Sequence, residues 1–301
     1  MFDHFVWSVL VVPPMIVVVV RLVVDRLAPG RAAMAVVWSA VTVAVASTIN
    51  LVLLSAHALA EIPAVGRGFG WSARVVADDT AYVAWVPWLS VGLTVAAAVS
   101  VTVRVRRHRQ VLALAPPGPG GLVMVDEADA RAFAVPGEPG HVVVTTGMRD
   151  ALSGPQFRAL LAHENAHLEG RHHRLVRAAE VAVAAHPALW WVGRHVDYLI
   201  ERAADERAAE QVGDRRLVAH AIGAAALAGA GGRADGGAGL HLADRPGVVP
   251  RRVARLLRPE PARVRRGLYA LPVAVAAASV VWTGEAAWDL VELLIRACRA
   301  V

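Results

Sequence analysis

The sequence predicts a mainly α-helical membrane protein, with four transmembrane helices and an α+β domain between the third and the fourth. Three observations predict this fold class. The 301-residue chain is 56% hydrophobic and has a mean hydropathy of +0.47, which is more apolar than an ordinary soluble domain. Its apolar residues gather in four long runs that arginine-rich segments border. Between the third run and the fourth, short strand patterns alternate with charged helical stretches.

The basic charge of the chain points to a lipid bilayer. The net charge of +6 first suggests a nucleic-acid partner. However, few aromatic residues interleave with the basic residues, and the arginines lie beside apolar runs, as the positive-inside rule requires. We therefore expect a bilayer and no direct contact with nucleic acid. The single cysteine, Cys298, excludes an intrachain disulfide and a thiolate zinc cluster.

Residues 1–110 are expected to form a three-helix transmembrane region, because about 20 apolar residues cross the core of a bilayer. The spans are predicted at about 5–24, 32–54 and 82–103. Pro13 and Pro14 should kink the first span. Residues 61–80 are expected to form a polar loop outside the membrane. Four arginines within 104–109 follow the third span at once, so the N-terminus should lie outside and the next domain in the cytoplasm. The expected location is a bacterial-type cytoplasmic membrane.

Residues 111–266 are expected to form the α+β domain. A linker rich in Pro and Gly at 115–121 opens it. Ser153-Gly154-Pro155 marks the start of a helix over 156–169. The apolar stretch 181–192 is too short to span a bilayer, so it should form a buried or interfacial helix pair. Strands are predicted at 122–125, 132–135 and 141–145, and further helices at 193–211, 217–230 and 248–257.

Residues 267–301 are expected to hold the fourth transmembrane helix and a short extracytoplasmic tail. The apolar core of this span is 268–282, which is short unless the helix extends past Gly284. Arg263 and Arg265 precede it, so the positive-inside rule places the last residues outside. A tail of about 18 residues is too short for a folded sensor domain.

The most informative stretch is His163-Glu164-Asn165-Ala166-His167, inside the predicted helix 156–169. Residues four apart share one face of a helix, so both imidazoles can reach a single ion. Zinc suits two histidines and a carboxylate with one position left open. Glu164 lies beside that face and can act as general base toward water. One catalytic Zn²⁺ is therefore the expected cofactor.

The third ligand has two candidates. The motif continues through Gly170 to His173 with the metzincin spacing, but that architecture needs a methionine turn downstream, and Met148 is the last methionine of the chain. The second candidate is Glu201 on a later helix, which completes the His/His/Glu site of a gluzincin. Asp205, one turn further, can accept the N–H of a ligating histidine and set its tautomer. We expect Glu201 to be the ligand.

A family resemblance supports this choice. The order of three spans, a basic border, short strands, LLAHENAHLEGRHH, ERAADERA, RRVARLL and a fourth span resembles the integral membrane zinc peptidases of the beta-lactam-sensor (antirepressor) type, whose partners are small winged-helix repressors. It is similar, more distantly, to the prenyl-protein and heat-shock membrane metalloproteases. The resemblance implies zinc at His163, His167 and Glu201, with Glu164 as the base. It also implies that Asp205 supports one of the ligating histidines without binding the metal itself.

Those more distant relatives have a strand before the metal helix, and Ala132-Phe133-Ala134 occupies its place here. An edge strand of this kind can hold a peptide substrate in extended form by backbone pairing. The chain also departs from the resemblance. No penicillin-binding domain follows the last span, so direct beta-lactam sensing is not expected. Arg245-Pro246 stands where the prenyl-protease-like relatives have His-Pro. The candidates for oxyanion stabilisation are Arg245, Arg251, Arg252, His195 and Tyr198.

We therefore expect a gluzincin-type zinc endopeptidase at the cytoplasmic face of the membrane. Its substrate should be a protein or a peptide, and a winged-helix repressor is one candidate. One alternative is a quality-control or prenyl-peptide-processing protease with the same site. A second alternative is a non-enzymatic membrane receptor in which the metal is structural. The sequence sets no oligomeric state.

Overall fold

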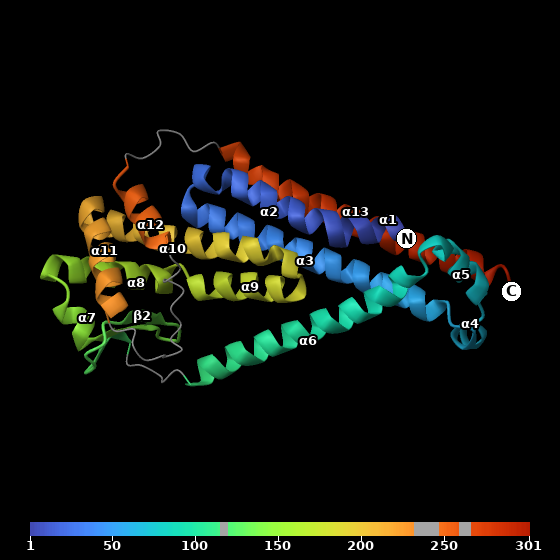
Figure 1. Ribbon diagram of the computed structural model, residues 1–301, viewed down its shortest axis with the longest axis horizontal. Coiled ribbons are helices and arrows are strands. Elements are labelled where there is room, and N and C mark those ends of the chain that lie inside the picture. Colours follow the sequence, from blue (N-terminus) through green and yellow to red (C-terminus); the bar gives the residue numbers. More distant parts are fainter. Residues whose placement is uncertain (115–119, 232–246, 259–265) are drawn as a thin grey trace.

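The computed structural model describes residues 1–114, 120–231, 247–258 and 266–301. Figure 1 shows an elongated helical bundle with a smaller α/β part at one end, while both termini lie at the opposite end. Four of the described helices are long and apolar enough to cross a membrane, and each extends past the C-terminal end of the span predicted for it, although the third begins at Trp85 instead of 82. They are Phe2–Arg26, Pro29–Ala60, Trp85–Gln110 and Gly267–Cys298.

The first span contains an irregular turn that its two prolines explain. It runs through α1 (Phe2–Phe5), the π-helical η1 (Val6–Val11), α2 (Val12–Val23) and the 3₁₀-helical η2 (Val24–Arg26). Pro13 and Pro14 have no N–H, so the carbonyl of Val9 loses both its i+4 and its i+5 donor. His186 supplies the missing donor, with its Nε2 atom 3.1 Å from that oxygen. Val9 lies about 25 Å from Arg26 along the helix, at about 1.5 Å per residue.

The connection between the second and third spans is helical, so the prediction of a polar loop over 61–80 is wrong. The spans themselves are α3 (Pro29–Ala60) and α6 (Trp85–Leu114), and between them lie α4 (Pro63–Phe69), α5 (Ala73–Asp79) and η3 (Ala81–Val83). Pro63 begins α4, and Gly70 ends it with a φ of 78°. These are the positions that Pro and Gly favour at helix ends. The indole of Trp71 donates to the carbonyl of Ala60 at 3.0 Å and fixes the segment on the bundle.

The three predicted strands form one small sheet in the order β1-β3-β2. They are β1 (Gly121–Val125), β2 (Ala132–Val135) and β3 (His141–Thr145). β1 is parallel to β3, whereas β2 is antiparallel to it and pairs Phe133 with Val143. The N–H of Thr145 donates to the carbonyl of Arg131, which sets the alternation of the ladder. Because alternate residues face opposite sides, the backbone groups of Ala132 and Ala134 point away from β3, toward the free edge.

The predicted helices of the central region are all present. The region contains α7 (Thr146–Asp150), α8 (Gly154–Glu169), α9 (His172–Ala185), η4 (Pro187–Leu189), α10 (Trp190–Val212), α11 (Arg215–Gly231) and α12 (Val248–Leu256), of which α7 and the first half of α9 were not predicted. Ser153 caps α8 as its sequence indicates, because Ser153 N–H donates to the Gln156 side chain at 2.9 Å and Gln156 N–H donates back to Ser153 Oγ. After η5 (Arg266–Tyr269), the last span is α13 (Ala270–Cys298), which continues well past Gly284.

The helix pair α9 and α10 packs on the membrane spans rather than beside the sheet. Ile16 of α2 and Val36 of α3 share one apolar core with Leu189 and Leu199 of the pair. Figure 1 shows α9 and α10 lying along α3. The apolar stretch 181–192 is thus the connection between α9 and α10 and not a helix pair by itself, and Trp190 and Trp191 within it are exposed. The far half of α10, which carries Glu201 and Asp205, emerges from the bundle and crosses α8.

Candidate metal centre

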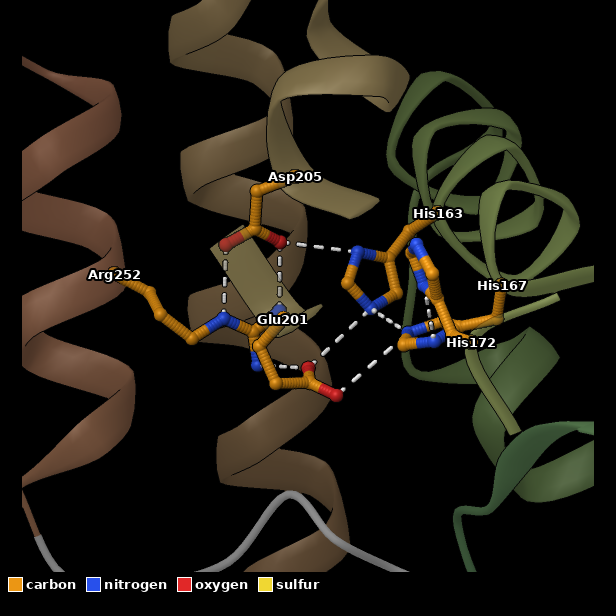
Figure 2. A network of polar contacts seen from close by, with 6 residues as sticks. All are labelled: His163, His167, His172, Glu201, Asp205 and Arg252. Carbon is orange, nitrogen blue, oxygen red and sulfur yellow. Dashed lines mark hydrogen bonds and ion pairs between the residues drawn. The ribbon is translucent and has the colours of Figure 1, made fainter. Parts of the chain in front are cut away.

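Three side chains from two helices converge on one point. The i, i+4 spacing of His163 and His167 on α8 brings their Nε2 atoms within 3.2 Å of each other. Glu201 on α10 faces both, with each carboxylate oxygen 3.6 Å from one imidazole Nε2 (Figure 2). Among the residues that the structure describes, one group of histidine, cysteine and acidic ligand atoms lies within 4.8 Å of one another, and it consists of these three residues.

The donor set fits a zinc ion. Two ligands at about 2.1 Å from a tetrahedral ion lie about 3.4 Å apart. The measured separations of 3.2 Å and 3.6 Å bracket that value. Two imidazoles and a carboxylate leave the fourth position open, as in catalytic zinc sites. His163 and Glu201 are 7% and 6% exposed, so the site is shielded on the protein side.

Asp205 lies behind His163. Its Oδ1 atom is 3.0 Å from Nδ1 of His163, on the side of the ring away from Nε2. This contact favours the tautomer that leaves Nε2 free for a metal. Burial lowers the pKa of His163, but its hydrogen bonds to Asp205 and Glu201 outweigh burial and raise the pKa to about 10. The metal-free site therefore holds a proton on His163 that a bound cation would displace.

The other ligands are already in the ionisation state that a cation needs. Burial, together with the nearby positive charge of His163, outweighs the raising effect of Glu201 and lowers the pKa of His167 to about 3, so this imidazole is neutral. Burial alone would raise the pKa of Glu201. The charge of Arg252 and the contact with His163 outweigh burial and hold that pKa well below its usual range. Glu201 is therefore a carboxylate and His167 has a free lone pair.

Arg252 is buried in this site, and its guanidinium is occupied. Nη1 lies 2.8 Å from Oε2 of Glu201, while Nε and Nη2 bind the two oxygens of Asp205 (Figure 2). The side chain comes from α12, so three helices meet at the centre. Because these nitrogens serve two carboxylates, Arg252 holds the α10 face in place. Its assignment to the oxyanion stays a prediction.

The other oxyanion candidates make the following contacts. Nδ1 of His195 donates to the carbonyl of Trp191 on its own helix. The guanidinium groups of Arg202 and Arg251 both lie near the ring of Tyr198, at 5.7 Å and 4.0 Å from its centroid. Arg245 falls outside the described residues. The assignment of an oxyanion group among these residues stays a prediction.

Glu164 lies between the metal centre and the sheet. The backbone N–H of Ala134 on β2 donates to its carboxylate. Burial raises the pKa of Glu164, and the negative charge of Glu201 adds to this effect. A carboxylate with a raised pKa is a better proton acceptor near neutral pH. The predicted substrate strand, Ala132 to Ala134, is thus the edge strand that touches the predicted base.

Sequence reasoning missed His172. Its Nδ1 atom lies 3.1 Å from Nδ1 of His167, whereas His173, which matches the metzincin spacing, is not part of the ligand group. The turn after α8 explains the difference. Arg171 has a left-handed φ of 47°, which starts α9 at once and returns His172 to the end of α8. The signal in the sequence was the pair of histidines directly after Gly170-Arg171.

A comparison with known proteins agrees with this geometry. A family model described as Peptidase family M48 matches residues 101–267, more than half of the chain. The matched segment contains α8, α9, α10 and α12, and hence all six residues drawn in Figure 2. No curated protein and no solved structure matches the chain.

Proposed function

Since the chain belongs to peptidase family M48, a family of zinc metallopeptidases, we propose that it is a membrane-embedded zinc endopeptidase of the gluzincin type. The observation that carries this proposal is the convergence of His163, His167 and Glu201 beside Glu164. Four helices that are long and apolar enough to cross a membrane support the membrane location.

The proposed chemistry is the addition of water to a peptide bond. When bound, zinc supplies a Lewis acid that polarises the scissile carbonyl and makes a water molecule more acidic. His163, His167 and Glu201 would hold the ion. Glu164 takes the proton of the attacking water, and it then delivers that proton to the nitrogen of the leaving amine. The raised pKa of Glu164 suits both transfers, because the group must accept a proton and release it within one turnover.

The free edge of β2 is the proposed substrate-binding surface. The backbone groups of Ala132 and the carbonyl of Ala134 face away from β3, so an extended peptide can pair with them as an added strand. Ala134 also contacts Glu164, so this pairing would bring a peptide bond close to the base. Only an extended segment can bind in this way. We therefore expect cleavage in unfolded or flexible parts of a protein.

We place the site at the cytoplasmic face of the membrane. The arginines within 104–109, at the end of α6 nearest the α/β part, favour that orientation through the positive-inside rule. The pair α9 and α10 is held among the spans by His186 and the shared apolar core, so the centre lies just beyond the bundle. A substrate would then meet the site at the membrane surface, and the N-terminus would lie outside.

The substrate class has two candidates. The resemblance to antirepressors of the beta-lactam-sensor type favours a winged-helix repressor. The likeness to the prenyl-protein and heat-shock proteases favours a quality-control or peptide-processing role at the same site. A comparison of the proteome in cells with wild type and with Glu164→Gln separates them. One stabilised soluble repressor supports the first role, and many stabilised membrane proteins support the second.

Glu164→Gln also tests the proposed function itself. The amide cannot accept the proton, so cleavage should be lost while the zinc content stays at one ion per chain. Asn165→Ala is the matched control, because Asn165 is exposed on the same helix and faces away from the ligands. Full cleavage by Glu164→Gln would rule out this mechanism. If zinc is bound and wild type cleaves nothing, the metal is structural and the protein is a receptor instead.

A further inference from the structure

The His167 ring is held on two sides. Its Nε2 atom faces His163 and Glu201, while its Nδ1 atom lies 3.1 Å from Nδ1 of His172 (Figure 2). The rings of His167 and His172 meet edge to face, with centroids 4.9 Å apart and an interplanar angle of 88°. His172 is 9% exposed. It therefore occupies the place behind His167 that Asp205 occupies behind His163.

The position of the protons follows from the metal site. His167 must keep the lone pair of Nε2 for the ion, so its proton resides on Nδ1. That N–H then donates to Nδ1 of His172, which accepts and carries its own proton on Nε2. The two ligand imidazoles thus rest on different acceptors. His163 donates to the carboxylate of Asp205, whereas His167 donates to the neutral imidazole of His172.

The turn between α8 and α9 is shaped around this ring. A Cβ atom at Gly170 would lie 2.4 Å from Nε2 and 2.7 Å from Cδ2 of His172, so any larger residue would push the ring away. The next residue, Arg171, adopts a φ of 47°, which is costly for a residue other than glycine. A glycine and a strained residue together bring His172, instead of His173, against His167.

We infer that His172 is a positioning residue for the metal: it accepts the Nδ1 proton of His167 and aims Nε2 of that ring at the ion. This inference rests on the proposed zinc site, but it does not depend on the site being a peptidase. Removal of the group that orients a metal-bound histidine typically lowers metal affinity about 10- to 100-fold. We expect a loss of that size when the acceptor at position 172 is removed.

Two substitutions separate the acceptor from the bulk of the side chain. In His172→Asn, Oδ1 stands the same number of bonds from Cα as Nδ1 of histidine, so an acceptor remains near His167. In His172→Leu, a methyl group takes that place without a lone pair. The full-length protein in detergent is titrated with zinc against a competing chelator. The leucine variant should lose about 10- to 100-fold in affinity, and the asparagine variant should recover most of it.

Two further variants complete the experiment. His173→Leu removes the neighbouring histidine and should leave zinc affinity unchanged. Gly170→Ala keeps His172 in the sequence but displaces its ring, so it should reproduce the loss of the leucine variant even if that variant folds poorly. The visible spectrum of the Co²⁺-loaded protein should change in His172→Leu and Gly170→Ala but not in His172→Asn.

Equal losses of zinc affinity in His172→Leu and His172→Asn would overturn the inference. Unchanged zinc affinity in both His172→Leu and Gly170→Ala would also overturn it. Wild type that binds zinc but cleaves nothing would overturn only the peptidase proposal.

Discussion

Arg252 donates two parallel hydrogen bonds to Asp205, from Nε to Oδ2 at 2.8 Å and from Nη2 to Oδ1 at 2.7 Å. Both side chains are buried, and the third guanidinium nitrogen reaches Glu201. Such bidentate pairs fix geometry as well as charge. The contact links α12 to the face of α10 that carries the third ligand, so the C-terminal part of the matched domain closes the metal centre.

Arg252→Met should destabilise the protein strongly. The substitution keeps the length of the side chain but leaves two buried carboxylates without a counter-charge, and breaking a buried pair in this way costs about 3–5 kcal/mol. Thermal unfolding of the metal-free protein in detergent measures the effect. Arg251→Met is the control, because Arg251 is exposed and pairs with the exposed Asp25, a contact worth at most about 1 kcal/mol. Similar melting temperatures for the two variants would contradict the structural role of Arg252.

Glu201→Gln and His173→Ala distinguish the two candidates for the third ligand. The first variant replaces the carboxylate that lies 3.6 Å from both imidazoles with a weak neutral ligand, so its zinc content should fall well below one ion per chain. His173→Ala should retain one ion. Elemental analysis of the purified full-length variants decides between them. The reverse result would restore the metzincin interpretation.

His186→Leu should destabilise the packing of the α9–α10 pair on the first span. The substitution leaves the carbonyl of Val9 buried without a donor, at a cost of about 1–3 kcal/mol. Pro13→Ala returns an N–H at the i+4 position of that carbonyl. The same leucine substitution should therefore cost less in a Pro13→Ala background, which a double-mutant cycle of melting temperatures measures. Strictly additive effects would show that His186 does not compensate for the proline.

Ala132→Pro tests the edge strand. The substitution removes an N–H that faces the free edge and leaves the ladder to β3 intact, which edge strands tolerate. If a substrate pairs with this N–H, kcat/KM for a cleaved peptide should fall about 2- to 10-fold, as expected for one hydrogen bond. Zinc affinity and melting temperature serve as controls and should not change. Unaltered kcat/KM in the folded variant would place the substrate elsewhere.

Local patterns account for most of the elements predicted from the sequence. Long apolar runs marked the four spans, and the cap at Ser153 marked the start of α8, because burial in lipid and helix capping depend on neighbouring residues. The segment 61–80 was the exception. Its Pro63 and Gly70 are common in loops, but the same residues also favour the two ends of a short helix. The hydrogen bond from Trp71 to the carbonyl of Ala60 holds this segment against the bundle and stabilises its helical form.

The sequence by itself determined which residues can share a face. The four-residue spacing places His163 and His167 on one face of a helix, and Glu201 and Asp205 on one face of another, because the helical period alone aligns such pairs. The tertiary structure decided everything that depends on how helices meet. It placed Arg252 against both acidic residues, and it turned the chain at Arg171 so that His172 reaches the metal ligand. Contacts of this kind join residues by the angle of a turn or the crossing of distant helices, and the period of a single helix carries no information about either.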